Sequence, residues 1–533
     1  MISFKEGLDE HNLPYPDFTS EFHLLPLLRP LAGAPNASAP EAVAFQELET
    51  NRPARIAFQA DGADWISTTH ALPAAYPRTH DHATSPPSRP LYPPGYGTDD
   101  PSLTAKQVRQ NHLKLMDETM LANLPPTYYP PKSALDADLD AERRRASRQP
   151  QLWSVVERIV PIHSGKARAQ NDRSGDKPGL TLVFAHANGF HKETYEPFAE
   201  ALIKRLSADP NGERVDEIWS IDVVDSGDAG GLNAASIGNC VHWMDHPRDI
   251  LNFLRHYLPA ASKTGGSPAS SGGRKRGLSA GAAGSYPADL NPNWPARLLP
   301  RTEPGAGLKG RRIVMFGHSF SGSAVALLNV MEPTLTERTI LVDPVILDVA
   351  NWEDGIVGCW PSHHPLATGA AVRKDLWPTR AAAAAFFKTK PYFTAWVPKA
   401  LDLFVRFGLR TVKRGGGLDS PHTLSMSKWS EAEAFKNNWQ ARYTWGALER
   451  NRGRGTAPLH LLAMSKSADF GIYGETNTAD RIRALVKSQS ESSTEKVLEG
   501  GHLIVQQNPD QLAEEVQKIL VPVQTHAETR ARL

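Results

Sequence analysis

The stretch RRIVMFGHSFSGSAVALLNVM, residues 311–331, contains the sharpest pattern in the chain. Its first part, up to Gly317, is a short and mostly apolar run, as in a strand that is buried on both faces. Its last part, from Gly322, has the small and aliphatic residues of a buried helix. Ser319 lies between the two parts. A serine on a sharp turn from strand to helix exposes its hydroxyl, so this stretch predicts a nucleophile.

The turn around the serine requires small residues two positions before it and two positions after it. Gly317 meets the first requirement, whereas Ser321 stands where the common pattern G-x-S-x-G has its second glycine. Gly322 follows one position later. Because a serine side chain is small, this departure is compatible with the turn, and we predict that Ser319 is the nucleophile.

A histidine downstream completes the pattern. The sequence GGHLI, residues 500–504, precedes the final predicted helix and contains His502. A histidine in a loop after the last strand reaches the carboxyl edge of the sheet, where the serine also lies. There its Nε2 atom can accept the serine proton, so we predict that His502 is the general base.

The sequence HANGF, residues 186–190, follows an early apolar strand. Acyl transfer places negative charge on a carbonyl oxygen, and two backbone N–H groups are needed to stabilise it. We expect one from Phe320, which follows the nucleophile, and the other from Asn188 in this loop. We expect His186 to brace the loop.

Two aspartates are candidates for the acid that orients His502. Asp469 follows the predicted strand APLHLLAMS, residues 457–465, and Asp343 follows the strand after the nucleophile's helix. Both positions lie at strand ends, where a carboxylate can reach the histidine. We favour Asp469 and keep Asp343 as the alternative.

Strand and helix patterns alternate from residue 151 onward, which predicts an α/β fold with a doubly wound, mostly parallel sheet. We expect an N-terminal extension at 1–150, partly disordered, and the first part of the core at 151–346. A Gly/Ser-rich insertion, about 259–309, interrupts it. A helical cap at 347–456 then precedes the penultimate strand. The second part of the core, 457–522, and a tail, 523–533, follow.

The composition excludes several classes of function. The 533 residues carry a formal net charge of +1, which gives no electrostatic reason to expect nucleic acid or an anionic membrane surface as partner. The two cysteines, Cys240 and Cys359, do not form a disulfide scaffold. We expect no transmembrane segment, because no apolar run approaches the roughly 20 residues that span a bilayer. We also expect no metal and no organic cofactor.

The motifs together resemble the α/β-hydrolase superfamily over about residues 152–521. AHANGFHKETYEPF, GHSFSGSA, LVDPV and GGHLIVQQNPDQLAEEV, with the cap sequence that begins LWPTRAAAAAFF, resemble one fungal branch. That branch includes a yeast peroxisomal triacylglycerol lipase and hydrolases of host-selective toxin biosynthesis. The resemblance implies an α/β-hydrolase fold and a serine esterase or lipase that cleaves a small-molecule ester or lipid. An acyltransferase, a thioesterase and a non-catalytic accessory protein of a biosynthetic pathway remain as alternatives.

Aromatic residues of the predicted cap suit an apolar acyl chain, although packing between cap and core must explain at least half of them. They are Trp377, Phe386, Phe387, Tyr392, Phe393 and Trp396.

The last three residues, Ala531-Arg532-Leu533, have the small-basic-Leu pattern related to Ser-Lys-Leu, which an import receptor reads as a peroxisomal address. With the fungal resemblance, this ending predicts a location in the peroxisomal matrix. A cytoplasmic location is the alternative.

Overall fold

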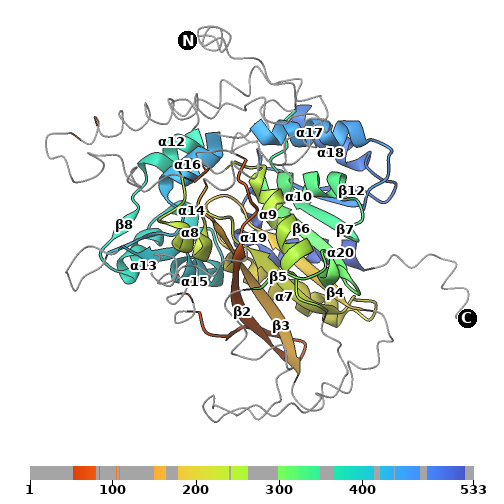
Figure 1. Cartoon of the computed structure of the whole chain (residues 1–533), viewed down its shortest axis with the longest axis horizontal. Coiled ribbons are helices and arrows are strands. Elements are labelled where there is room, and N and C mark those ends of the chain that lie inside the picture. The colour runs from red at the N-terminus through yellow and green to blue at the C-terminus, as the bar shows by residue number, and fades with distance from the viewer. Residues whose placement is uncertain are drawn as a thin grey trace, which may run out of the picture.

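A computed structural model of the chain describes residues 48, 52–79, 83–84, 104, 107, 149–163, 178–238, 242–261, 298–348, 365–412, 421–436, 439–467 and 477–521. Figure 1 shows a sheet with helices on both sides and a separate group of helices beside it. The C-terminal tripeptide and Asp469 lie outside these residues.

The described residues form a nine-stranded sheet with the order β1-β2-β3-β5-β4-β6-β7-β11-β12. The strands from β5 to β12 are parallel, and β1, β2 and β3 add antiparallel pairs at one side. The predicted mostly parallel sheet is therefore confirmed. The strands are β1 (Arg55–Ala60), β2 (Ala63–Pro73), β3 (Trp153–His163), β4 (Leu180–Ala185), β5 (Val215–Ile221), β6 (Arg312–His318), β7 (Arg338–Val342), β11 (Leu459–Met464) and β12 (Thr494–Leu498).

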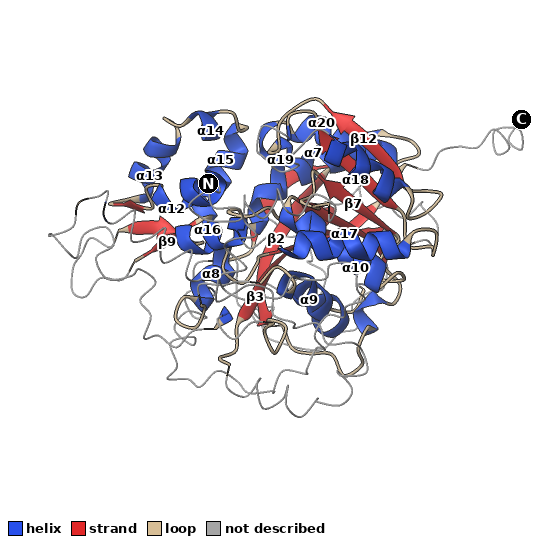
Figure 2. Ribbon diagram, turned by 90° about the horizontal axis from the view of Figure 1, so that it is seen from above, coloured by secondary structure: helices blue, strands red, loops and turns tan. Residues whose placement is uncertain are grey.

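Helices cover both faces of the sheet (Figure 2). Along β4, Leu182 and Phe184 join one apolar core while Val183 and Ala185 join the other, because successive side chains of a strand point to opposite faces. The first core contains α7 (Glu196–Ala208) and α20 (Pro509–Leu520). The second contains α9 (Asp245–Asn252), α10 (Phe320–Met331), α17 (Trp439–Asn451) and α18 (Asn477–Lys487).

The N-terminal extension contributes to the core, contrary to the expectation that the sheet begins near residue 152. β2 pairs with β3 over eleven residues, from Ala63 opposite His163 to Pro73 opposite Trp153. β1 folds back onto β2 as a hairpin. A Pro-rich sequence begins near Ala71 and favours irregular structure, whereas the apolar residues of β1 and β2, which form the hairpin, precede it.

Arg78 attaches the segment after β2 to helix α9. Its side chain is 1% exposed, and its Nη1 and Nη2 atoms donate to Asp249 at 2.6 and 3.1 Å. Its Nε atom lies 3.3 Å from Asp245, which also pairs with Arg248 at 2.6 Å. Burial opposes the charge of Arg78, but the two carboxylates raise the pKa of its guanidinium above the ordinary value. These ion pairs therefore fix the position of α9.

The predicted cap region contains helices and a small antiparallel sheet, which lie beside the main sheet (Figures 1 and 2). Its last helix, α17, belongs to the core, since Trp445 and Leu448 pack in the second core. The other elements are α12 (Pro365–Val372), α13 (Arg380–Phe387), α14 (Pro391–Thr394), α15 (Pro398–Phe407), α16 (Lys428–Lys436), β8 (Leu376–Trp377), β9 (Leu409–Thr411) and β10 (His422–Leu424).

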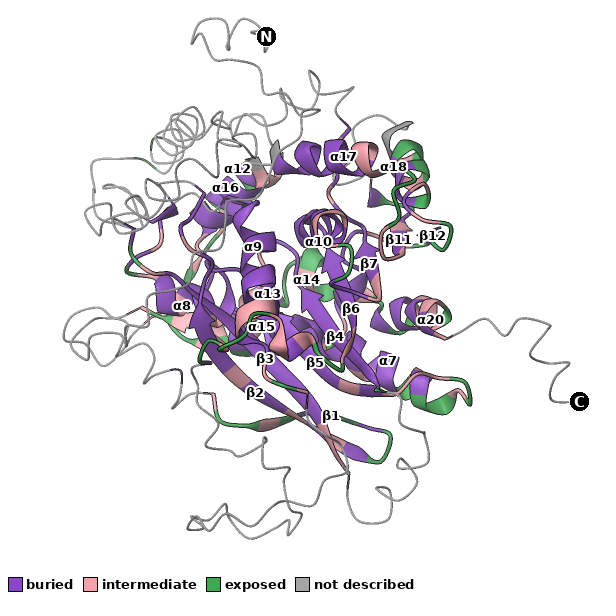
Figure 3. Cartoon of the chain, turned by 45° about the vertical axis from the view of Figure 1, so that its right-hand side comes forward, coloured by how far each residue is buried: buried purple, intermediate pink, exposed green. Residues whose placement is uncertain are grey.

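The Gly/Ser-rich insertion lies outside the described residues from 262 to 297. Its last part, however, packs on the core. Leu298 is buried, and its amide donates to the carbonyl of Ala71 at 2.8 Å. Figure 3 shows that buried residues continue through the strands and the helices that contact them.

Arg78→Ala should lower the free energy of unfolding by about 3–5 kcal/mol, because it leaves Asp245 and Asp249 buried with less compensating charge. Urea denaturation measures the change. Arg452→Ala is the control, because Arg452 and its partner Glu449 are both exposed, and such a pair contributes about 0–1 kcal/mol. Equal losses in the two variants would contradict the assigned role of Arg78.

Candidate active site

Ser319 lies in the sharp turn between β6 and α10, with φ of 60° and ψ of −126°. Close backbone contacts explain the small residues around it. A Cβ atom on Gly317 would lie 2.4 Å from the carbonyl oxygen of Ser321, and one on Gly322 would lie 2.6 Å from Cβ of Pro344. Neither distance is tolerated without a shift of the chain, so both glycines are required by the turn.

The Ser319 hydroxyl contacts His502. Ser319 Oγ lies 2.9 Å from His502 Nε2, and His502 Nδ1 lies 2.6 Å from Asp343 Oδ2. Ser319 is 7% exposed, His502 is 8% exposed and Asp343 is fully buried. A serine, a histidine and a carboxylate in this series can move a proton from the hydroxyl to the imidazole.

The carboxylate beside His502 is thus that of Asp343, the alternative candidate predicted from the sequence. Asp343 follows the last residue of β7, the strand adjacent to β6, and so it lies one strand from Ser319. The favoured candidate, Asp469, lies outside the described residues. Asp343 instead accepts hydrogen bonds from the amide of Met464, the last residue of β11, at 3.0 Å, and from the hydroxyl of Ser467 in the loop that follows.

His318 fixes the loop that carries His502. Its Nε2 atom donates to the carbonyl oxygen of His502 at 2.8 Å. Burial lowers the pKa of His318 to about 3, so the ring is neutral at pH 7. The motif GHSFSG contains His318, but no local sequence signal indicates its contact with the loop of His502.

Ser321 connects the turn to the loop at residues 186–190. Its hydroxyl donates to the carbonyl oxygen of His186 at 2.5 Å and lies 2.9 Å from His246 Nε2. The serine that departs from G-x-S-x-G therefore makes two buried contacts that a glycine lacks. Only the position of His246 in the fold reveals the second contact, since 75 residues separate the two in sequence.

The loop at 186–190 is held at both ends, as expected for a bracing role of His186. Burial lowers the pKa of His186 to about 3. In this neutral ring Nε2 accepts from the amide of Val223 at 3.1 Å, so Nδ1 carries the hydrogen and donates to the carbonyl of Ala187 at 2.8 Å. Asn188 lies in the middle of the loop, and its side chain donates to the carbonyl of Glu431 in the cap.

Lys192 anchors the end of this loop. Its buried Nζ atom lies 2.9 Å from Asp222 and from Glu193, and 2.6 Å from Asp228. Burial opposes the charge, but the three carboxylates raise the pKa of Lys192 well above its ordinary value. Arg52, before β1, pairs with Asp228 at 2.7 Å and extends the network to the N-terminal segment.

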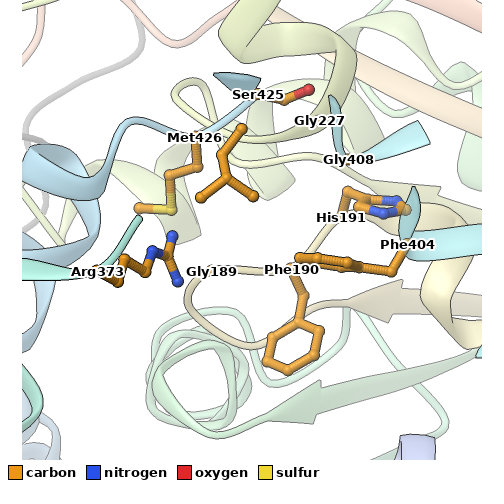
Figure 4. A pocket seen from close by; sticks show the side chains of 10 residues that line it. Gly189, Phe190, His191, Gly227, Arg373, Phe404, Gly408, Ser425 and Met426 are labelled. Carbon is orange, nitrogen blue, oxygen red and sulfur yellow. The ribbon is translucent and has the colours of Figure 1, made fainter. Parts of the chain in front are cut away.

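One cavity lies between this loop and the cap, with about 220 Å³ of empty space, part of which is open to solvent. Figure 4 shows Arg373 and Met426 of the cap at one side of it and His191 and Phe404 at the other. The Arg373 Nη1 atom donates to Glu431 at 3.0 Å, so its charge is partly compensated. The lining residues are Gly189, Phe190, His191, Gly227, Arg373, Phe404, Gly408, Leu424, Ser425 and Met426.

A second cavity lies beside the turn of Ser319, with about 280 Å³ of empty space, part of which is open to solvent. Asn188 and Phe320, the two residues predicted to stabilise an oxyanion, both line it, and Met426 lines both cavities. We name this second space the elbow cavity. Its lining residues are Asn188, Val223, Asp225, Ser226, His242, Trp243, His246, Phe320, Met426 and Ala434.

The aromatic residues predicted to bind an acyl chain mostly pack among themselves. Trp377, Phe387 and Trp396 are buried in one cluster, where Trp396 stacks on Phe190 with ring centroids 5.3 Å apart. Tyr392 is 45% exposed. These aromatic side chains therefore connect the cap to the loop at 186–190, and they do not line either cavity.

Two further properties concern only the part of the chain that the structure describes. No helix there combines the length and apolar character needed to cross a membrane. No group of three or more His, Cys, Asp or Glu side chains is arranged there to hold a metal ion.

Comparison with known proteins identifies the family. Residues 182–515, more than half of the chain, match the model described as the alpha/beta hydrolase family. The chain belongs to the alpha/beta hydrolase family. The expected superfamily and fold are thereby confirmed, and the order of the parallel strands agrees with them.

Two curated fungal relatives are similar to this alpha/beta hydrolase. A type I acyl-CoA thioesterase of Penicillium roqueforti is 24% identical over 256 residues, which are 48% of this chain and 44% of that protein. A Saccharomyces cerevisiae protein named as a peroxisomal membrane protein is 24% identical over 36% of this chain and 37% of its own. The chain spans about half the length, or less, of these relatives.

A solved structure shows the same fold. The peroxisomal alpha-beta-hydrolase of Saccharomyces cerevisiae superimposes with a TM-score of 0.50 and 15% identity, over 88% of this chain and 95% of that chain.

Proposed function

We propose that the chain is a serine hydrolase that cleaves the acyl bond of a carboxylic ester through an acyl-enzyme intermediate. The observation that carries this proposal is the series of contacts from Ser319 Oγ to His502 Nε2, at 2.9 Å, and from His502 Nδ1 to Asp343, at 2.6 Å. In this mechanism His502 accepts the serine proton as Oγ attacks the acyl carbonyl. It then donates the proton to the leaving group, and later activates the water that releases the acid.

The backbone N–H groups of Phe320 and Asn188 stabilise the oxyanion in this proposal. Phe320 is the first residue of α10, so its N–H also lies at the positive end of the helix dipole. Ser321 supports the arrangement, because its hydrogen bond to His186 O fixes the distance between the helix and the loop that carries Asn188.

Thioester hydrolysis is the second candidate, because the relatives from Penicillium are named acyl-CoA thioesterases. The same residues serve both reactions. A thiolate is a weaker base than an alkoxide, so its departure depends less on protonation by His502. The ratio of turnover for an ester and a thioester of one acyl group separates the two candidates.

We also propose that the protein is a peroxisomal matrix enzyme that an import receptor recognises through Ala531-Arg532-Leu533. In support of this location, the yeast relative is named as a peroxisomal membrane protein, and the similar yeast structure is that of a peroxisomal alpha-beta-hydrolase.

Ser319→Ala should abolish covalent labelling by a fluorophosphonate probe and should abolish ester hydrolysis, because the attacking oxygen is removed. Mass spectrometry of the labelled wild type should find the probe on Ser319. Ser323→Ala is the control, since Ser323 is in the same helix and its hydroxyl donates to Thr444. Labelling of the Ser319→Ala variant at the wild-type rate would refute the assignment of the nucleophile.

Asp343→Asn should lower kcat for the best ester by about 10⁴-fold, because the amide favours the wrong tautomer of His502. Asp469→Asn is the matched control and should retain turnover. A stopped assay with the purified proteins measures kcat of both variants. If Asp469→Asn lowered kcat strongly and Asp343→Asn did not, Asp469 would be the acid.

Residues 522–533 fused to the carboxyl end of a fluorescent reporter should direct it to spots that contain a peroxisomal marker. Removal of Ala531–Leu533 should leave the reporter diffuse, because the receptor needs the terminal carboxylate and the apolar side chain of Leu533. A diffuse reporter that carries the intact ending would contradict the proposed location.

A further inference from the structure

The elbow cavity contains two buried polar groups that no catalytic step uses. They belong to His246 on α9, 1% exposed, and to Asp225 after β5, 3% exposed. Within the described part of the chain, His246 Nδ1 and Asp225 Oδ2 have no hydrogen-bond partner. Because an unpaired buried polar atom costs about 1–3 kcal/mol, these two atoms of one cavity need a partner, either a water molecule or a polar group of a bound ligand that displaces it.

The hydrogen bonds of Ser321 assign the tautomer of His246. The carbonyl oxygen of His186 has no hydrogen, so the Ser321 hydroxyl must donate to it. With its one hydrogen used, Ser321 Oγ can only accept from His246 Nε2, 2.9 Å away. Burial lowers the pKa of His246 to about 3, so its ring is neutral at pH 7. Nε2 therefore carries the hydrogen, and Nδ1 is a lone-pair acceptor.

Asp225 is the second acceptor. Its Oδ1 atom accepts from the hydroxyl of Ser226 at 3.0 Å, which leaves Oδ2 without a donor among the described residues. Burial raises the pKa of Asp225 to about 6, so the group is mostly a carboxylate at neutral pH. Both unpaired atoms thus accept hydrogen bonds, and a ligand that pairs with them must donate.

The rest of the cavity wall is apolar, with Val223, Trp243, Phe320 and Met426 among its residues. Neither Ser319 nor His502 lines this cavity, but Asn188 and Phe320, the proposed oxyanion donors, both do. In the proposed reaction the acyl carbonyl therefore lies at the edge of the elbow cavity, and the acyl chain is the part of the substrate that borders it.

We infer that the preferred substrates have an acyl group with a hydrogen-bond donor, a hydroxyl or an amino group, that pairs with His246 Nδ1 and Asp225 Oδ2. This inference rests on the proposed function. It deepens that function by distinguishing a functionalised acyl chain from a plain fatty acyl chain. A site with buried acceptors discriminates strongly against an analogue that lacks the donor, because the acceptors then remain unpaired.

The test uses p-nitrophenyl octanoates with one hydroxyl, amino or methoxy group at successive chain positions, together with the plain octanoate. At its best position the hydroxyl or amino ester should exceed the plain ester in kcat/KM by about 10- to 100-fold. The methoxy ester is the matched control, because it has similar size and polarity but cannot donate. If the methoxy or the plain ester equals the best donor ester, the inference is overturned.

Two variants of His246 separate recognition from packing. His246→Gln keeps an N–H near the position of Nε2 and loses the acceptor at Nδ1. The ratio of kcat/KM for the donor ester to kcat/KM for the plain ester should therefore fall toward one. His246→Asn keeps an acceptor near Nδ1 and should retain most of the preference. Asp225→Asn should abolish the preference for an amino group. An unchanged preference in both His246→Gln and Asp225→Asn would overturn the inference.

Binding provides a readout that does not require turnover. Thermal-shift titrations of the wild type with free 2- to 8-hydroxyoctanoic acids and with octanoic acid compare affinity directly. If the enzyme hydrolyses no ester but binds a hydroxy acid preferentially, the proposed reaction fails and the recognition stands. If it hydrolyses all of the esters equally and binds all of the acids equally, the reaction stands and the recognition fails.

Discussion

Ser319 has a φ of 60°, and Asp343 has a φ of 42°. Residues other than glycine adopt such conformations at a cost of about 1–3 kcal/mol each, and only where the surroundings determine them. Here the amide of Ser319 donates to the carbonyl of Val342, and its own carbonyl accepts from Val345. The ends of β6 and β7 are thereby joined, and this backbone arrangement holds the hydroxyl and the carboxylate on the two sides of His502.

The surroundings of the site are connected to segments far away in sequence. Arg78, after β2, holds helix α9 through Asp249. The same helix carries His246, which contacts Ser321 and lines the elbow cavity. The cap reaches the site from the other side, where Trp396 stacks on Phe190. The geometry around Ser319 therefore depends on ion pairs and aromatic packing outside the sequence motifs that predicted the site.

The sequence was sufficient to predict the sheet and the contact between Ser319 and His502, because the turn and the final loop have local signatures. It did not determine the acid, since Asp343 and Asp469 both follow strands and only the order of the strands distinguishes them. The roles of Ser321 and His246 also depend on a long-range contact that no local pattern records. The hairpin of β1 and β2 was missed because a Pro-rich stretch follows it.

The match to the family model begins at residue 182, within β4, and so it leaves out β1, β2 and β3. In the whole chain β3 pairs with β5 along one side of the parallel strands. A fragment cut at the limits of the match would leave the buried, apolar β5 as an open edge, with unpaired N–H and C=O groups along its length. Such an edge is a template for pairing between chains, so that fragment would aggregate even if its triad were intact.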